Sequence, residues 1–221
     1  MSTYMTEEEQ IEAIKSWWKK HGNTVSTVIL IVVMCFAGFR YWQWNKQKVD
    51  FQASNLYEQM LSAYTNQDKK AIVSRANKLV QNHSGTVYGD TAHLTLAKVA
   101  AEKKLYDKAA THLNAVIKDD THSALTQVAK IRLARVLLAK KEYQSALSAI
   151  DQVSDDSYIS LVKELRGDIF TAMGDFNKAK LAYEEALTSS RKQKMGNLFL
   201  EMKTNDVARL QMSEQSNIKT A

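Results

Sequence analysis

Apolar residues follow two patterns along the chain, first a continuous run and then a helical period. From His21 to Phe39 no residue carries a full charge, and Lys20 and Arg40 close this interval. The 19 residues of the interval come close to the roughly 20 that a helix needs to cross the ~30 Å hydrocarbon layer of a bilayer. We therefore predict a transmembrane helix over residues 23–44, called the anchor below.

Aromatic residues mark both ends of this interval. All four tryptophans and a tyrosine lie there, which is typical of side chains at the level of the lipid headgroups. A cleaved export signal fits less well, because the preceding segment is long and acid-rich and no small-residue cleavage motif follows. A soluble core helix would not normally collect its tryptophans at its two ends. The predicted membrane-interface residues are Trp17, Trp18, Tyr41, Trp42 and Trp44.

The segment before the anchor, residues 1–22, has a helical pattern of its own. Thr6 and Glu9 form a capping-box signature, and Gly22 stands where a helix C-cap is expected. Apolar residues recur between these signals at helical spacing. We predict a short amphipathic helix lying on the membrane surface, and a polar tail with partial helicity is the alternative.

Charge does not orient the anchor. Each side carries three nearby basic residues, so the positive-inside rule favours neither orientation. These residues are Lys15, Lys19 and Lys20 before the anchor and Arg40, Lys46 and Lys48 after it.

A repeat follows the anchor. The stretches "KKLYDKAATHLNAV" (Lys103–Val116), "KKEYQSALSAIDQV" (Lys140–Val153) and "MGDFNKAKLAYEEA" (Met173–Ala186) align, with spacings of 37 and 33 residues. These spacings bracket the 34-residue tetratricopeptide period. The aligned positions hold an aromatic residue, an alanine three residues later and a small residue nine residues earlier. They are Tyr106, Tyr143 and Phe176; Ala109, Ala146 and Ala179; and Ala97, Ala134 and Gly167.

These positions describe a helical hairpin that stacks on its neighbours. Small residues on both helices allow a close approach, and the aromatic fills the space at the turn. One hairpin cannot bury its own apolar face, so neighbouring hairpins must stack. The absence of proline also suits stacked helices. We predict an all-α chain in which a tetratricopeptide-like α-solenoid over residues 45–212 follows the anchor, with a disordered tail at 213–221.

The first helices of such hairpins line the concave face of the stack, which could hold an extended or helical polypeptide. Packing against the next hairpin is the alternative role for the same side chains. The predicted protein-binding residues are Leu94, Lys98, Val128, Ile131, Arg135, Leu161, Glu164 and Asp168.

Nothing in the sequence indicates a catalytic or metal-binding site. HExxH, GxSxG, P-loop and GxGxxG motifs are missing, and the five histidines show no ligand spacing. We therefore predict no catalytic residue, cofactor or metal, and we read His93 and His112 as surface or packing residues. The net charge of +6 suits a solvated surface, anionic lipid or acidic clients. The sequence lacks the run of basic residues with interleaved aromatic residues that is typical of nucleic-acid binding.

The chain resembles a known family over nearly its whole length. "EEEQIEAIKSWWKKHG" (Glu7–Gly22) and "GFRYWQ" (Gly38–Gln43) are similar to the start of the bacterial YfgM family, the ancillary subunit of the Sec translocon. "LRGDIFTAMGDFNKAKLAYEEAL" (Leu165–Leu187) and "EMKTND" (Glu201–Asp206) are similar to its last hairpin and terminal helix. The chain departs from the family at Val207–Ala221, which extends past the usual end.

The resemblance implies a single-pass protein of the bacterial inner membrane, with its N-terminus in the cytoplasm and its repeats in the periplasm. It implies association with the SecYEG translocon and with the periplasmic chaperone PpiD. It also implies a role in passing newly translocated, unfolded proteins to periplasmic chaperones. A tetratricopeptide scaffold of a different cell-envelope or division complex is the alternative function.

Overall fold

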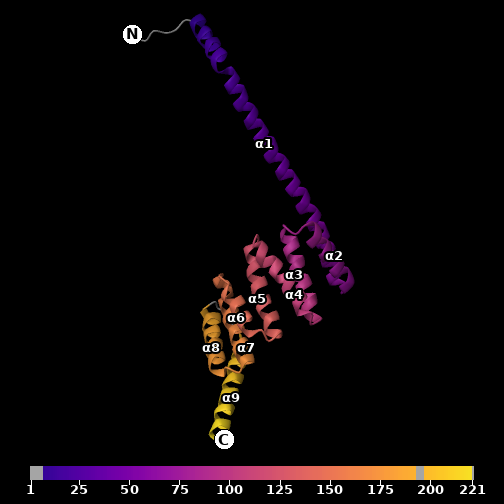
Figure 1. The fold of residues 1–221 in the computed structure, drawn as a ribbon, viewed down its shortest axis with the longest axis vertical. Coiled ribbons are helices and arrows are strands. Elements are labelled where there is room, and N and C mark those ends of the chain that lie inside the picture. Colours follow the sequence, from indigo (N-terminus) through magenta and orange to yellow (C-terminus); the bar gives the residue numbers. More distant parts are fainter. Residues whose placement is uncertain (1–6, 193–196, 221) are drawn as a thin grey trace, which may run out of the picture. The chain divides into compact units, whose positions relative to one another are not determined.

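A computed structural model of the chain describes residues 7–192 and 197–220, and every regular element within these ranges is helical (Figure 1). The predicted capping box begins at Thr6, which lies outside the described residues. The helices are α1 (Glu7–Thr65), α2 (Lys69–Asn82), α3 (Val87–Glu102), α4 (Tyr106–Asp119), α5 (Ser123–Ala139), α6 (Tyr143–Asp151), η1 (Asp156–Tyr158), α7 (Ile159–Met173), α8 (Phe176–Lys192) and α9 (Leu198–Thr220).

The chain divides into two compact units, Met1–Gln52 and Ala53–Ala221. The first unit holds most of α1, including an 18-residue window that is apolar enough to cross a membrane and is only 6% buried. The helix runs through Gly22 without interruption, so the predicted C-cap there is wrong. Gly22 remains helical because the apolar run that follows it contains no proline and continues the helix.

The second unit is a stack of helical hairpins in which successive helices lie side by side (Figure 1). α3 pairs with α4, α5 with α6 and α7 with α8, and each pair packs on the next. The predicted tetratricopeptide-like solenoid is therefore confirmed. The small residues that were predicted to allow close approach are buried: Ala97, Ala109, Ala134, Ala146, Gly167 and Ala179.

The second helices of these three hairpins begin at the aligned aromatic residues, and the turns before them have a common backbone form. The residue two positions before each second helix has a left-handed φ, of 60° at Lys104, 65° at Lys141 and 81° at Gly174. Gln67, with a φ of 54°, occupies the same place before α2. The last turns of α1 therefore form a further hairpin with α2, and this hairpin is in phase with the repeat.

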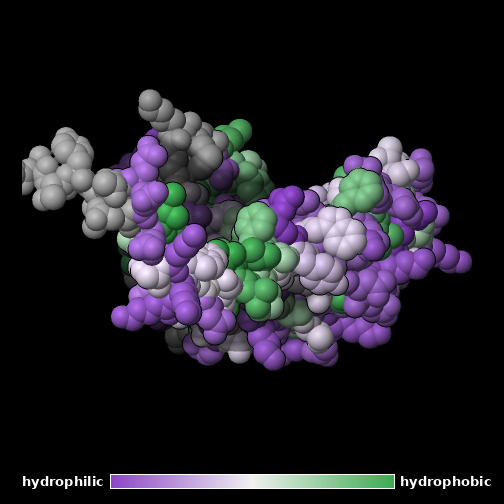
Figure 2. Space-filling model, turned by 90° about the horizontal axis from the view of Figure 1, so that it is seen from above, coloured by the Kyte–Doolittle hydropathy of each residue, from purple (hydrophilic) through white to green (hydrophobic). Residues whose placement is uncertain are grey.

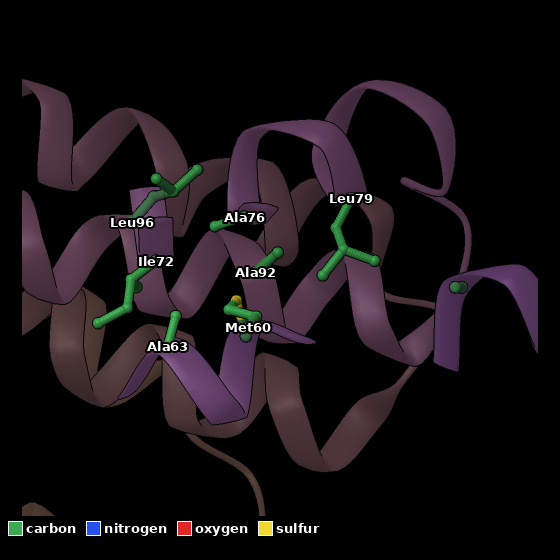
Figure 3. Packing of buried hydrophobic residues seen from close by; sticks show 8 residues of the cluster. Met60, Ala63, Ile72, Ala76, Leu79, Ala92 and Leu96 are labelled. Carbon is green, nitrogen blue, oxygen red and sulfur yellow. The ribbon is translucent and has the colours of Figure 1, made fainter. Parts of the chain in front are cut away.

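The first hairpin has a core of its own. Met60 and Ala63 from α1 meet Ile72 and Leu79 from α2, and Ala92 and Leu96 of α3 complete the cluster (Figure 3). All of these side chains are buried. The end of α1 is thus part of the solenoid, and its apolar positions switch from the continuous run of the anchor to a helical period.

α9 closes the other end of the stack by burying Leu200 and Val207 against the last hairpin. It begins at Leu198 and extends to Thr220. The helix thus passes residue 213, where the sequence predicts a disordered tail. No proline or glycine occurs after Leu198 to stop it.

Candidate binding groove

Two adjoining hollows open along the first helices of the hairpins. The first has a volume of about 440 Å³ and lies between the last turns of α1, α3 and α5. The second has a volume of about 390 Å³ and lies between α3, α4 and α5. Lys98 and Arg132 line both hollows, so we treat the two as one groove. Its lining residues are Tyr57, Met60, Leu61, Tyr64, Thr91, Leu94, Thr95, Ala97, Lys98, Ala101, Glu102, Leu113, Leu125, Val128, Arg132, Arg135 and Val136.

The groove combines an apolar lining with a basic rim. Lys98, Arg132 and Arg135 are exposed, whereas Leu94 is buried and Val128 is half-buried. Figure 2 shows the molecule from above, a view in which hydrophobic patches interrupt a mostly hydrophilic surface and the groove is not marked. The lining therefore offers apolar contact and positive charge within the same opening.

Contacts within the groove hold two of the three cations in place. Lys98 Nζ donates a hydrogen bond of 2.5 Å to Tyr64 Oη and lies 5.1 Å from the centre of that ring. This hydrogen bond raises the pKa of Lys98, so the lysine is charged at neutral pH. Arg132 Nη1 donates to the Leu94 carbonyl at 3.5 Å. Both side chains are thus positioned before any ligand arrives.

The groove brings together four of the eight residues predicted to bind protein. Leu94, Lys98, Val128 and Arg135 all line it. Ile131 does not, since it is only 3% exposed and packs in the core cluster of α5, α6 and α7.

The other three predicted residues lie on α7, away from the two hollows. Leu161 packs against the same core cluster as Ile131. Glu164 and Asp168 form ion pairs with Lys203 of α9, at 2.8 Å and 2.7 Å. Tyr183 adds a hydrogen bond of 2.8 Å from its hydroxyl to Asp168. These carboxylates therefore bind the terminal helix.

Lys203 keeps its charge in this contact. Burial works to lower the pKa of Lys203, but the two carboxylates outweigh it, so the pKa is raised. Burial also raises the pKa of the Tyr183 hydroxyl beside it. The arrangement fastens α9 to α7 and leaves the groove between α1, α3 and α5 as the open part of the concave face.

Sequence reasoning missed the other lining residues, among them Tyr57, Leu61, Tyr64 and Arg132. Leu61 stands 37 residues before Lys98, the same separation as that between the turn residues Gln67 and Lys104. Extending the repeat phase by one hairpin toward the N-terminus would thus have placed Leu61 on the concave face.

Comparison with known proteins places this geometry in a family. Residues 15–209 match the model of the tetratricopeptide repeat-like domain. The crystal structure of the MamA protein is similar to this one, with a TM-score of 0.59 and 17% sequence identity. The match covers 76% of this chain and 86% of the MamA chain, so the two proteins share the fold. A protein of Haemophilus influenzae, named ancillary SecYEG translocon subunit, is 31% identical over 189 residues, which are 86% of this chain and 92% of the relative. The chain belongs to the YfgM family of ancillary SecYEG translocon subunits.

A second member of the YfgM family extends the match. The Escherichia coli protein of the same name is 29% identical over 210 residues, covering 94% of this chain and all of the relative. Together with family membership, the exposed apolar window of α1 indicates a single-pass inner-membrane protein.

The predicted membrane-interface residues Trp17, Trp18, Tyr41, Trp42 and Trp44 are all exposed on α1. Lys46 Nζ lies 5.7 Å from the centre of the Trp42 ring, and Lys48 Nζ lies 5.6 Å from that of Trp44. Aromatic rings with nearby lysines are the side chains expected where a spanning helix leaves the lipid.

Histidines form a second polar cluster on the hairpin of α3 and α4. His93 Nδ1 lies 3.1 Å from His112 Nδ1, and both side chains are half-buried. Nearby, His122 Nδ1 contacts Oδ2 of the buried Asp90 at 2.7 Å. Among the described residues no group of three His, Cys, Asp or Glu side chains is placed to hold a metal ion. A hydrogen bond between two imidazoles needs one neutral ring to accept, so the pair couples hairpin packing to protonation.

We expect acid to weaken this hairpin. Burial lowers the pKa of His93, against the charges of Asp90 and Asp119, and burial together with His93 lowers the pKa of His112. A histidine whose pKa is lower in the folded state than in the unfolded state stabilises the fold at pH values above its unfolded-state pKa of about 6.5. This stabilisation is lost as the pH falls through the folded-state pKa. The melting temperature should therefore fall between pH of about 7.5 and about 5.5.

The variant His112→Gln isolates this effect. Asp90 changes the stability with pH in the opposite direction, because burial raises the pKa of its carboxyl despite the hydrogen bond with His122. The variant keeps Asp90 and His122 and removes the imidazole pair, so its melting temperature should depend less on pH. An identical pH dependence in both proteins would contradict the assignment to His93 and His112.

Proposed function

We propose that this protein is a non-enzymatic, membrane-anchored scaffold of the Sec translocon. Its groove receives newly translocated polypeptides and helps to pass them to periplasmic chaperones such as PpiD. The observation that carries the proposal is an open, apolar groove with a basic rim in a member of a family named for the SecYEG translocon.

The groove chemistry suits an unfolded client. A newly translocated chain is extended and exposes apolar side chains, which the lining around Leu94 and Val128 can cover. The two hollows are open to solvent along one face of the helices, so a segment can enter from the side without threading. An open site of this kind favours brief contact, which a relay between channel and chaperone requires.

The proposal assigns an orientation, with the N-terminus in the cytoplasm and the solenoid in the periplasm. Protease added to cells with a permeabilised outer membrane tests this directly. The proposed orientation would be supported if the protease digests the solenoid and leaves the segment before the apolar window of α1 intact. Protection of the solenoid would place the groove in the cytoplasm, out of reach of exported chains, and would overturn the proposal.

The partners are tested by affinity purification from membranes in a mild detergent. We expect SecYEG subunits and PpiD to be recovered with the full chain. Recovery of another cell-envelope or division complex without any translocon subunit would instead support the alternative scaffold.

A further inference from the structure

We propose that the groove selects acidic segments: extended stretches of polypeptide in which Asp or Glu side chains lie next to aliphatic ones. This inference rests on the proposed function, because its ligand is a polypeptide held by the same groove. It adds the chemical class that the groove prefers.

The first argument is an excess of positive charge. Lys98, Arg132 and Arg135 all line the groove, and Glu102 is the one acidic side chain among the described lining residues. Glu102 is also shared with Lys69, whose Nζ lies 3.9 Å from its Oε2. The charge of Arg132 acts unfavourably on that of Lys98, although Glu102 attracts Lys98 more strongly. One carboxylate therefore stands against three cations in the groove. Carboxylates placed between these cations would relieve that repulsion and form charge-assisted hydrogen bonds.

The second argument is the apolar surface that lines the same hollows as the cations. Leu61 and Leu125 line the first hollow, and Val136 lines the second. Leu61 is 45% exposed although it belongs to a folded helix end. In an extended ligand every second side chain points to the same side. Of the side chains that face the groove, aliphatic ones can enter the hollows while acidic ones reach the rim.

The number and spread of the cations favour acidic side chains over a single C-terminal carboxylate. Lys98 and Arg132 border both hollows, whereas Arg135 borders the second alone. One terminal carboxylate cannot neutralise a rim that extends over two hollows, whereas several acidic side chains along a segment can. The ligand is therefore an internal acidic segment of a polypeptide.

Fluorescence anisotropy with the full chain in nanodiscs of zwitterionic lipid tests the preference. Three short labelled peptides are compared: a Leu/Glu peptide with an amidated C-terminus, the same peptide with Gln for Glu, and the Gln peptide with a free C-terminal carboxylate. We expect the Glu peptide to bind at least about tenfold more tightly than either Gln peptide. The difference should shrink as salt is added, because rim charges are screened.

Matched variants locate the effect. The double variant Lys98→Gln, Arg135→Gln should lose most of the preference for the Glu peptide, because both side chains line the groove. Lys108→Gln removes an exposed lysine of α4 that does not line it and should keep the preference. Unchanged thermal unfolding of both variants shows that the fold is retained.

The contradicting results are distinct from one another. Equal affinity for the Glu and amidated Gln peptides would overturn the acidic preference and leave the proposed function intact. Tightest binding of the Gln peptide with a free carboxylate would replace the acidic segment by a chain end. Binding of none of the three peptides would count against the groove as a polypeptide site and hence against the proposed function as well.

Discussion

A chain that begins at Asn45 is expected to leave the membrane fraction completely and to fold as a soluble protein. The deletion removes the exposed apolar window of α1, which lies in the first compact unit. It retains Ala53, Met60 and Ala63, the α1 residues that are buried with α2 and α3. The hydrophobic clusters of the solenoid therefore stay complete, and the groove keeps every lining residue.

Cell fractionation and thermal unfolding measure both parts of this expectation. The truncated chain should be found in the soluble fraction with a single cooperative transition. A chain that begins at Gln67 is the matched comparison, because it also lacks the α1 residues that cover Ile72 and Leu79. It should be markedly less stable or aggregate. Aggregation of both chains would show that the solenoid depends on the first unit and would contradict the division.

Ala146→Leu is expected to destabilise the solenoid by about 1–3 kcal/mol, the usual cost of overpacking a filled core. Ala146 is fully buried where α6 meets α5 and α7, among Ile131, Ala134 and Leu165. A leucine there adds three carbon atoms to a contact that depends on a small side chain. For a chain of this size each kcal/mol lowers the melting temperature by roughly 2–4 °C.

Ala124→Leu is the control for this substitution. Ala124 is exposed in the first turn of α5, so the added carbon atoms meet solvent and the stability should change by less than about 0.5 kcal/mol. Equal melting temperatures of the Ala146→Leu variant and the parent protein would mean that the close helix contact has been assigned to the wrong position.

The stacked hairpins could be predicted because their constraints are local and recur. Each close helix contact demands a small residue, and each turn is followed by an aromatic, so Ala109, Ala146 and Ala179 mark the same contact three times. The end of the amphipathic helix predicted before the anchor was harder to place. Gly22 has the residue type of a C-cap, but only the residues beyond it decide whether the helix stops.

The repeat phase alone could not separate the four predicted binding residues that line the groove from the four that do not. Lys98, Arg135 and Asp168 occupy equivalent positions of the repeat. Asp168 nevertheless forms an ion pair with Lys203 of the terminal helix, whereas Lys98 and Arg135 line the groove. That difference depends on α9, which lies outside the repeat and carries no repeat signal. Arg132 was missed because the position of a long side chain depends on its partner, here the Leu94 carbonyl.

Site-specific photocrosslinking to an exported chain arrested in the translocon tests whether the groove receives translocating polypeptides. A photoreactive residue in place of Leu61 samples the groove, and one in place of Lys108 samples a position outside it. We expect an adduct between position 61 and the arrested chain, which disappears when the chain is released, and little or none from position 108. No adduct from position 61, or equal adducts from both positions, would contradict a groove that receives translocating polypeptides.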